Sequence, residues 1–379
     1  MRDESTDLDG DVPDCPHSRS LSTQHRPVVS RRLGGPVVSG DAAGWRDSQG
    51  DRLTSAELLS DLDETVARQR ALGNSAAFDK DNGWAWIIDR RHHLVRLPLH
   101  EYREVPVRSL WPLLRSPGVW SAEFLTKPSD TSSSNAIHYV AAGDKFGLEL
   151  MGAKRRSRVR KSMGTYAARP TTGAFVRLHG LKAAADTASR HGLAPPSAVG
   201  FQGWMWRLEF SGAEFWCASR NEYSIDAWAA VRVTGNTAVI PLAKSVSEEL
   251  TPSPNEALVF AMCQHYFSDR EVNTVSYGLS SLATSHDKAR ALDHFKTQMG
   301  FEPIPVLRNV VLPWRAELFM ATPPVLSALS HLSRFERRYG LDTFTKMSGL
   351  AQLARSRPAK WSSATSADPL MGERKAVPE

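Results

Sequence analysis

The segment between Asp226 and Leu312 constrains the fold most, because strand and helix patterns alternate along it without a break. DAWAAVRV and TAVIPLA are apolar over strand lengths, and the Thr234-Gly235-Asn236 triplet between them is typical of a hairpin turn. VNTVSYG (272–278) and VLRNVVL (306–312) are two further short strands. With helices between them, this order predicts a mixed α/β layer fold.

Two helices with clear end signals separate these strands. SPNEALVFAMCQHYF starts with Ser253 as N-cap, Pro254 at the first helical position and Glu256, which completes an S-x-x-E capping box. SHDKARALDHFKTQMG ends at Gly300, which is expected to be a left-handed cap. Both segments also place apolar residues on one face at helical spacing.

The preceding part of the chain has weaker patterns. Helices are predicted over Ser55–Gly73 and Leu181–Gly192, and a third from Phe146 that turns from apolar to basic along its length. Strands are predicted over Trp84–Asp89, His93–Leu99, Ala136–Ala142, GWMWRLEF (203–210) and EFWCASR (214–220). The tryptophan pairs Trp84/Trp86 and Trp204/Trp206 recur at period two, which places each pair on one face of its strand.

Composition excludes several classes of protein. The three cysteines have no CxxC spacing, so we expect neither a disulfide framework nor a cysteine zinc site, and the histidines suggest no metal centre. No apolar stretch approaches the roughly 18 residues of a membrane span, which predicts a soluble, cytoplasmic protein. Residues 1–55 and 349–379 are polar and aperiodic, so a disordered leader and tail are expected.

The net charge is localised. The chain has 47 basic and 41 acidic residues, a formal charge of +6, and the octet KRRSRVRK (154–161) holds six basic residues and no acid. Since 6 − 6 = 0, the remainder is neutral. Three interpretations stay open: a solvated helix face, a phosphate clamp, or a surface for nucleic acid or another polyanion. Arg156, Arg160 and Lys161 are the anion-binding candidates.

Two of these stretches carry a family resemblance. The run from Tyr277 to Val306 is similar to the pattern of a strand, a glycine, small residues, a helix ending in F-K-x-x-x-G-F and a closing strand. RRSRVRKSM (155–163) is similar to a basic helix between two half-domains. Over residues 80–315 the chain therefore resembles the FemAB-like branch of the Gcn5-related N-acetyltransferase (GNAT) superfamily. The resemblance implies a GNAT-like mixed sheet flanked by helices, with a degenerate first half (76–170) and a second half (171–320).

The resemblance also implies a function and a site. An acyl or aminoacyl group would be moved onto an amine acceptor, from acyl-coenzyme A or aminoacyl-tRNA, where TAVIPLAKS and VNTVSYG splay apart. The candidate catalytic residues are Tyr277, Glu222 and Asp226. The candidate donor or phosphate-binding residues are Ala243, Lys244, Ser245, Ser253, Asn255 and Lys296.

Each candidate has a structural alternative. Tyr277 could be a half-buried strand residue, the carboxylates could face solvent, and Lys296 could complement a helix dipole.

One departure from the superfamily affects the choice of donor. GNAT enzymes usually hold the coenzyme A pyrophosphate in a glycine-rich loop before a helix, whereas residues 245–255 contain no glycine and include Glu248 and Glu249. This favours aminoacyl-tRNA over acetyl-coenzyme A. Two alternatives remain: a catalytically inactive module that binds nucleic acid or another polyanion through Lys154–Lys161, and a conventional acetyl-coenzyme A enzyme with an atypical loop.

Overall fold

The computed structural model describes residues 56–90, 92–128, 134–191, 193–246, 253–270, 272–281 and 287–313, with short pieces at 322 and 327–328. The leader predicted over 1–55 and the tail predicted over 349–379 lie outside the described residues. The strands are β1 (Ala77–Asp79), β2 (Trp84–Arg90), β3 (His93–Leu97), β4 (Ser121–Thr126), β5 (Ala136–Ala142), β6 (Ala167–Thr171), β7 (Glu214–Ser219), β8 (Ala227–Thr234), β9 (Thr237–Ser245), β10 (Thr274–Ser281) and β11 (Glu302–Val311). The helices are α1 (Ala56–Ala71), α2 (Val107–Leu114), α3 (Ala153–Thr165), α4 (Gly173–His179), α5 (Leu181–Arg190), α6 (Ala198–Phe210), α7 (Pro254–Ser268) and α8 (Asp287–Gln298).

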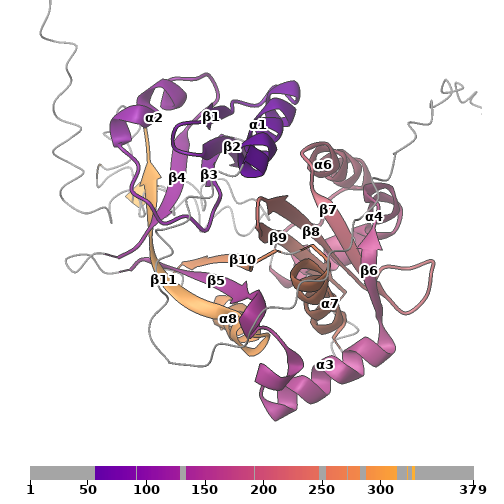
Figure 1. The fold of residues 1–379 in the computed structure, drawn as a ribbon. Helices are drawn as coiled ribbons and strands as arrows, with labels where there is room; N and C mark the ends of the chain where they lie inside the picture. Colours follow the sequence, from indigo (N-terminus) through magenta and orange to yellow (C-terminus); the bar gives the residue numbers. More distant parts are fainter. Residues whose placement is uncertain are drawn as a thin grey trace, which may run out of the picture. The chain divides into compact units, whose positions relative to one another are not determined.

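The strands form a mixed sheet in the order β1-β2-β3-β4-β11-β5-β10-β9-β8-β7-β6. The last strand in sequence, β11, joins two groups of strands: Glu302–Val306 pairs with β5, and Leu307–Val311 pairs with β4. Figure 1 shows β11 running from beside β5 to beside β4. The predicted α/β class, a mixed sheet flanked by helices, is confirmed.

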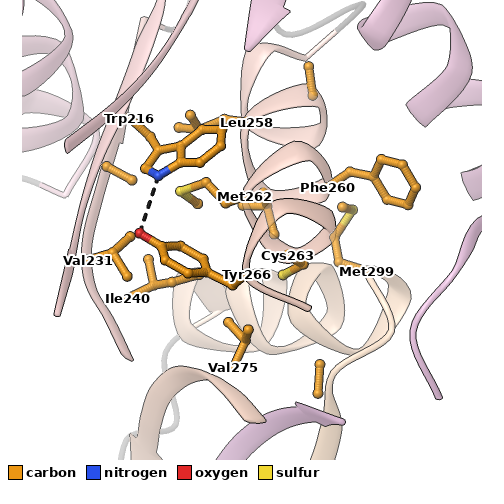
Figure 2. Packing of buried hydrophobic residues seen from close by; sticks show 14 of the residues in the cluster. Trp216, Val231, Ile240, Leu258, Phe260, Met262, Cys263, Tyr266, Val275 and Met299 are labelled. Atoms are coloured by element: carbon orange, nitrogen blue, oxygen red, sulfur yellow. Dashed lines mark hydrogen bonds between the residues drawn. The ribbon is translucent and has the colours of Figure 1, made fainter. Parts of the chain in front are cut away.

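Alternation along β7 and β8 supplies two apolar faces. Trp216 on β7 and Ala229 on β8 pack against α7, while Phe215 and Trp228 pack against the helices α4–α6. Because successive side chains of a strand point to opposite faces, helices can cover both sides of the sheet. Figure 2 shows the α7 side, where the Trp216 indole N–H donates a hydrogen bond of 3.3 Å to the Tyr266 hydroxyl.

The same alternation organises the first group of strands. Trp84 and Trp86 pack into one cluster with α2, while Ala85 and Ile87 pack against α1. The prediction that Trp84 and Trp86 share one strand face is therefore confirmed. The predicted hairpin at Thr234–Asn236 is also confirmed, with Gly235 at φ +55°.

The strand predicted over GWMWRLEF is wrong, because these residues belong to helix α6. The Ser197 hydroxyl caps this helix by accepting a hydrogen bond from the Gly200 amide. On a helix the two tryptophans lie on different faces: Trp204 packs with Trp228, whereas the Trp206 residue is 53% exposed. A segment with apolar residues at nearly every position fits both periods, so alternation alone could not distinguish them.

The helix predicted from Phe146 begins too early. Residues before Gly152 form two short 3₁₀ turns, Gly143–Lys145 and Leu148–Leu150, and α3 starts only at Ala153. The chain is extended at Gly147 and Met151, which interrupts the helical hydrogen-bond pattern.

Strands β9 and β10 separate soon after they meet. They pair in parallel only through Thr237–Val239 and Thr274–Ser276, and then each continues along its other neighbour. Each strand has a bulge at this point: one extra residue on β9 between Val239 and Leu242, and one on β10 between Ser276 and Leu279. Pro241 cannot donate to a ladder, and Gly278 adopts φ +74°, so the sequence itself favours both irregularities. We call this place the strand divergence.

Replacing Gly278 with alanine should destabilise the protein through the backbone alone. A Cβ at Gly278 would meet nothing within 4 Å, but φ is +74°, so a loss of about 1 kcal/mol in unfolding free energy is expected. Gly203 of α6 also has open space around its Cβ, with ordinary helical geometry, so Gly203→Ala should stabilise by about 0.5–1 kcal/mol. Urea unfolding measures both, and equal effects of the two variants would contradict the left-handed assignment.

Candidate functional site

A buried lysine lies beside the strand divergence. Lys296 of α8 is 3% exposed, and its Nζ lies 4.7 Å from the ring centre of Tyr139 on β5 and 5.5 Å from that of Tyr277 on β10. Tyr277 directly follows Ser276, the last β10 residue that pairs with β9. Two of the candidates from the sequence, Tyr277 and Lys296, are thus brought together.

The surroundings of Lys296 make its charge costly. Burial lowers the pKa of Lys296 to about 8, and the nearby Asp293 carboxylate opposes that shift only in part. Asp293 in turn accepts a hydrogen bond of 2.6 Å from the Ser280 hydroxyl, and it contributes to the raised pKa of Tyr139, of which burial is the main cause. Burial also raises the pKa of Tyr277, so its phenol keeps its proton. The site therefore holds a proton-bearing phenol and an ammonium that can lose its proton slightly above neutral pH.

A chain of polar groups behind Tyr277 holds the divergence. Nε2 of His138 lies 2.6 Å from Ser276 Oγ, and Nδ1 of His138 lies 2.9 Å from the Tyr102 hydroxyl. Ser276 Oγ also accepts a hydrogen bond from the Gly278 amide, which fixes the bulge. His138 is fully buried, and burial lowers its pKa to about 3, so the ring is neutral at neutral pH.

The backbone N–H and C=O groups at the end of β9 alternate between the side of β8 and the opposite side. Val246 donates its N–H to the Asp226 carbonyl, so by antiparallel alternation Ala243 and Ser245 turn their N–H and C=O groups away from β8. The Ser245 amide already donates to Thr187 Oγ1 at 3.0 Å, and the Ser245 carbonyl accepts from Arg190 at 2.7 Å. Among the three candidates on β9, Ala243 is the one whose amide turns toward the side that β10 has left and has no partner given to it by Thr187.

The first turn of α7 confirms part of its predicted start. Ser253 is the N-cap and Pro254 the first helical residue, but the Ser253 hydroxyl makes no capping hydrogen bond, so the capping box is wrong. Asn255 instead donates to Ser245 Oγ at 2.8 Å. Glu256 is fully buried and turns toward α3.

Helix α3 supplies the partners of Glu256. Arg155 pairs with the Glu256 carboxylate and also donates to Gln298 of α8, while Arg158 lies 3.0 Å from Glu256 and Ser162 donates to it at 3.2 Å. We call this set the Glu256 clasp. Two arginines of the octet therefore have an acidic partner, Glu256 of α7. This partner lies about 100 residues further along the chain, so periodicity within the octet cannot reveal it.

The remaining cations of α3 differ from those in the clasp. Arg160 and Lys161 are exposed and Arg156 is half-buried. Among the described residues, no acidic side chain lies within ion-pair distance of these three. They remain anion-binding candidates.

The other carboxylate candidates lie away from the Lys296 cluster. Glu222 is exposed in the turn between β7 and β8. Asp226 is 5% exposed and is held by Arg220, which donates both its backbone N–H and a guanidinium N–H at 3.0 Å. These contacts give Asp226 a structural role in fastening the turn. Lys244 lies on β9, opposite Trp228 of β8 in the antiparallel register.

The sequence reasoning missed several polar residues that the fold assembles. Tyr139 and His138 are neighbours in the strand AIHYVAA. The sequence could therefore indicate only that they face opposite sides of the sheet, not what they contact. His93 lies between two polar partners, with its ring nitrogens 2.6 Å from Ser121 Oγ and 2.8 Å from Glu123 Oε2. Arg308 of β11 also binds Glu123 and depresses its pKa, although burial opposes the shift. Ser121 is only 1% exposed, so these hydrogen bonds and ion pairs connect β3, β4 and β11 in the interior.

Searches for known relatives gave matches in structure only. No family model matches the chain, and no curated protein sequence matches it. Solved structures that are similar include FemX (10% identity, TM-score 0.47, covering 67% of this chain and 94% of FemX) and the L-PGS protein from Bacillus licheniformis (13%, 0.43, 67% and 90%). A GCN5-related N-acetyltransferase from Kribbella flavida is also similar (11%, 0.35, 68% and 94%). FemX and GNAT proteins are thus both among the similar structures.

No helix within the described residues is long and apolar enough to cross a membrane.

Removing the Lys296 charge should change how stability depends on pH. Because the folded pKa is about 8 and the ordinary value is 10.5, the folded state holds fewer protons than the unfolded state between these values. The free energy of unfolding should therefore rise with pH across this window, by up to about 3 kcal/mol. Lys296→Met should remove the rise, and the exposed Lys161→Met should retain it. Denaturant titrations at several pH values provide the test, and a wild-type curve as flat as that of Lys296→Met would contradict the assignment.

Breaking the Glu256 clasp should be costly. Glu256→Gln leaves the guanidinium of Arg155, whose side chain is 10% exposed, without its counter-charge, and a loss of about 3 kcal/mol in unfolding free energy is expected. Glu222→Gln changes the same functional group at an exposed position and should have almost no effect. If chemical denaturation gave similar midpoints for both variants, the clasp would not stabilise the fold.

Proposed function

We propose that this protein transfers an acyl or aminoacyl group onto an amine, with the reacting groups at the strand divergence. The observation that carries the proposal is that β9 and β10 stop pairing after three residue pairs while Tyr277 and Lys296 meet beside that point. The separation leaves backbone donors of β9 without a neighbouring strand. In the superfamily that the sequence resembles, the acyl group lies at the corresponding place.

The described residues suit an acyl transfer that uses little dedicated acid–base machinery. The amine nitrogen bonds to the acyl carbon and gives up one proton to water, while negative charge develops on the carbonyl oxygen. The bond from that carbon to the leaving group then breaks, and the leaving group takes up a proton. The Ala243 amide is the candidate donor to the oxyanion, and the Lys296 ammonium supplies positive charge nearby. Tyr277 keeps its proton and is the candidate acid for the leaving group. Glu222 and Asp226 are not part of this proposal, since one is remote in a turn and the other is engaged by Arg220.

The first turn of α7 fits a coenzyme A pyrophosphate poorly. Pro254 has no amide hydrogen, and the Glu256 amide already donates to the Ser253 carbonyl at 3.1 Å. The buried Glu256 carboxylate adds negative charge in the same turn. These observations agree with the glycine-free segment before the helix, and we favour aminoacyl-tRNA as the donor.

A second candidate function rests on three cations of α3 that lie outside the Glu256 clasp. Arg156, Arg160 and Lys161 form no ion pair among the described residues, in contrast to Arg155 and Arg158. They fit the phosphates of RNA, either as part of a tRNA-dependent transferase or in a module that binds a polyanion without catalysis.

Product formation from two donor classes tests the proposal. The full chain is incubated with a pool of aminoacyl-tRNA or with acyl-coenzyme A esters and a panel of small amines, and amide products are detected by mass spectrometry. We expect product from aminoacyl-tRNA, reduced about 100-fold in Lys296→Met and about tenfold in Tyr277→Phe. Tyr223, which is 81% exposed, provides the matched control Tyr223→Phe, which should keep full activity.

The alternatives give different results in the same assay. If acyl-coenzyme A alone yields product, the choice of donor is wrong. If neither donor yields product and Arg156→Glu with Arg160→Glu abolishes salt-sensitive RNA binding, the binding module replaces the transferase. Product formation that is unchanged in Lys296→Met would place the reaction elsewhere.

A further inference from the structure

Helix α6 is apolar on two opposite faces. Phe201 and Met205 are almost completely buried and pack against the sheet. Val199, Trp206 and Phe210 are spaced by seven and four residues, so they share one stripe along the helix, directly opposite the buried face. The exposure of these three residues is 82%, 53% and 41%. We call them the α6 stripe.

The stripe has the composition of a covered surface. Trp206 and Phe210 are large apolar side chains of the kind that folded proteins bury for the most part, yet the described helices leave both exposed. Trp206 and Phe210 stack on each other, with ring centres 5.4 Å apart and an interplanar angle of 23°. The pairing fixes both rings at the surface, so the apolar face is preformed.

The area of the stripe argues against a second protein as its partner. With side-chain areas of roughly 150–250 Å², these exposures leave on the order of 300 Å² of apolar surface. A stable protein interface buries about 800 Å² on each partner. A few aromatic side chains on a convex helix are instead sufficient for insertion into the boundary of a lipid bilayer.

The charges around the stripe specify the kind of lipid surface. Helix α6 itself carries two charged residues, Arg207 and Glu209. Glu209, beside the stripe, is paired with Arg177. Among the described residues no acidic side chain lies within ion-pair distance of the exposed Arg207. The face thus combines aromatic anchors with an available cation, which suits anionic headgroups.

We propose that the α6 stripe docks this protein on an anionic membrane surface, with Trp206 and Phe210 inserted at the headgroup level and Arg207 against lipid phosphates. The proposal does not depend on the transferase function. It adds a peripheral membrane contact to a chain whose described helices do not span a bilayer.

Vesicle cosedimentation of the full chain tests the docking. The probes are vesicles of phosphatidylcholine alone and vesicles in which about one-third of the lipid is phosphatidylglycerol. We expect binding to the anionic vesicles that weakens with salt, and a loss of at least about tenfold in Trp206→Ser/Phe210→Ser. Arg207→Glu should weaken binding to the anionic vesicles. Trp120, also 53% exposed but outside α6, provides the matched control Trp120→Ser, which should bind as the wild type does.

The outcomes are decisive because the substituted side chains are exposed and circular dichroism verifies the fold of each variant. Absence of binding to anionic vesicles, or equal binding by Trp206→Ser/Phe210→Ser, would overturn the proposal. A concentration-dependent dimer of the wild type that dissociates in that double variant would also overturn it, because the stripe would then be covered by a second copy.

Discussion

The pairing of β11 with two different strands is the constraint on which the rest of the structure depends. Its first five residues complete the ladder of β5, and its last five complete that of β4. Backbone hydrogen bonds from a single continuous strand therefore join the two groups of strands. Arg308 lies just after the point where β11 changes from β5 to β4, and its guanidinium binds the Glu123 carboxylate. The Asn135 side chain, which comes just before β5, hydrogen-bonds to the backbone N–H and C=O of Arg308. Side-chain contacts thus reinforce the place where the backbone changes neighbours.

The candidate site follows from that arrangement. β5 lies between β11 and β10, so its side chains reach the residues where β10 leaves β9. His138 holds the bulge through Ser276, and Tyr139 lies against Lys296. The buried ammonium of Lys296 opposes stability because it loses hydration, whereas the neutral ring of His138 replaces its lost hydration with hydrogen bonds to Ser276 and Tyr102. The buried Lys296 with its lowered pKa, beside a strand edge without a neighbouring strand, is the observation on which the proposed site rests.

Prediction from the sequence worked where local chemistry sets the structure. Pro254 and Ser253 fixed the start of α7, and the glycine of the 234–236 turn fixed the hairpin. It failed where two periods fit one segment, as in α6, because a residue such as Trp206 is apolar yet exposed. It named Tyr277 and Lys296 as separate candidates but did not name Tyr139, His138 or the partners of Glu256, since contacts across more than 90 residues leave no periodic trace.

The sequence by itself determined the class of fold, the end signals of α7 and α8 and the concentration of positive charge in one octet. These properties depend on hydrogen bonding and patterning within a few residues, so they can be inferred without a structure. Only the tertiary structure decided which cations of that octet are neutralised by Glu256, which tyrosines surround Lys296, and which face of α6 remains uncovered. Those properties arise when distant segments meet, because burial and pairing are set by the neighbours that packing supplies.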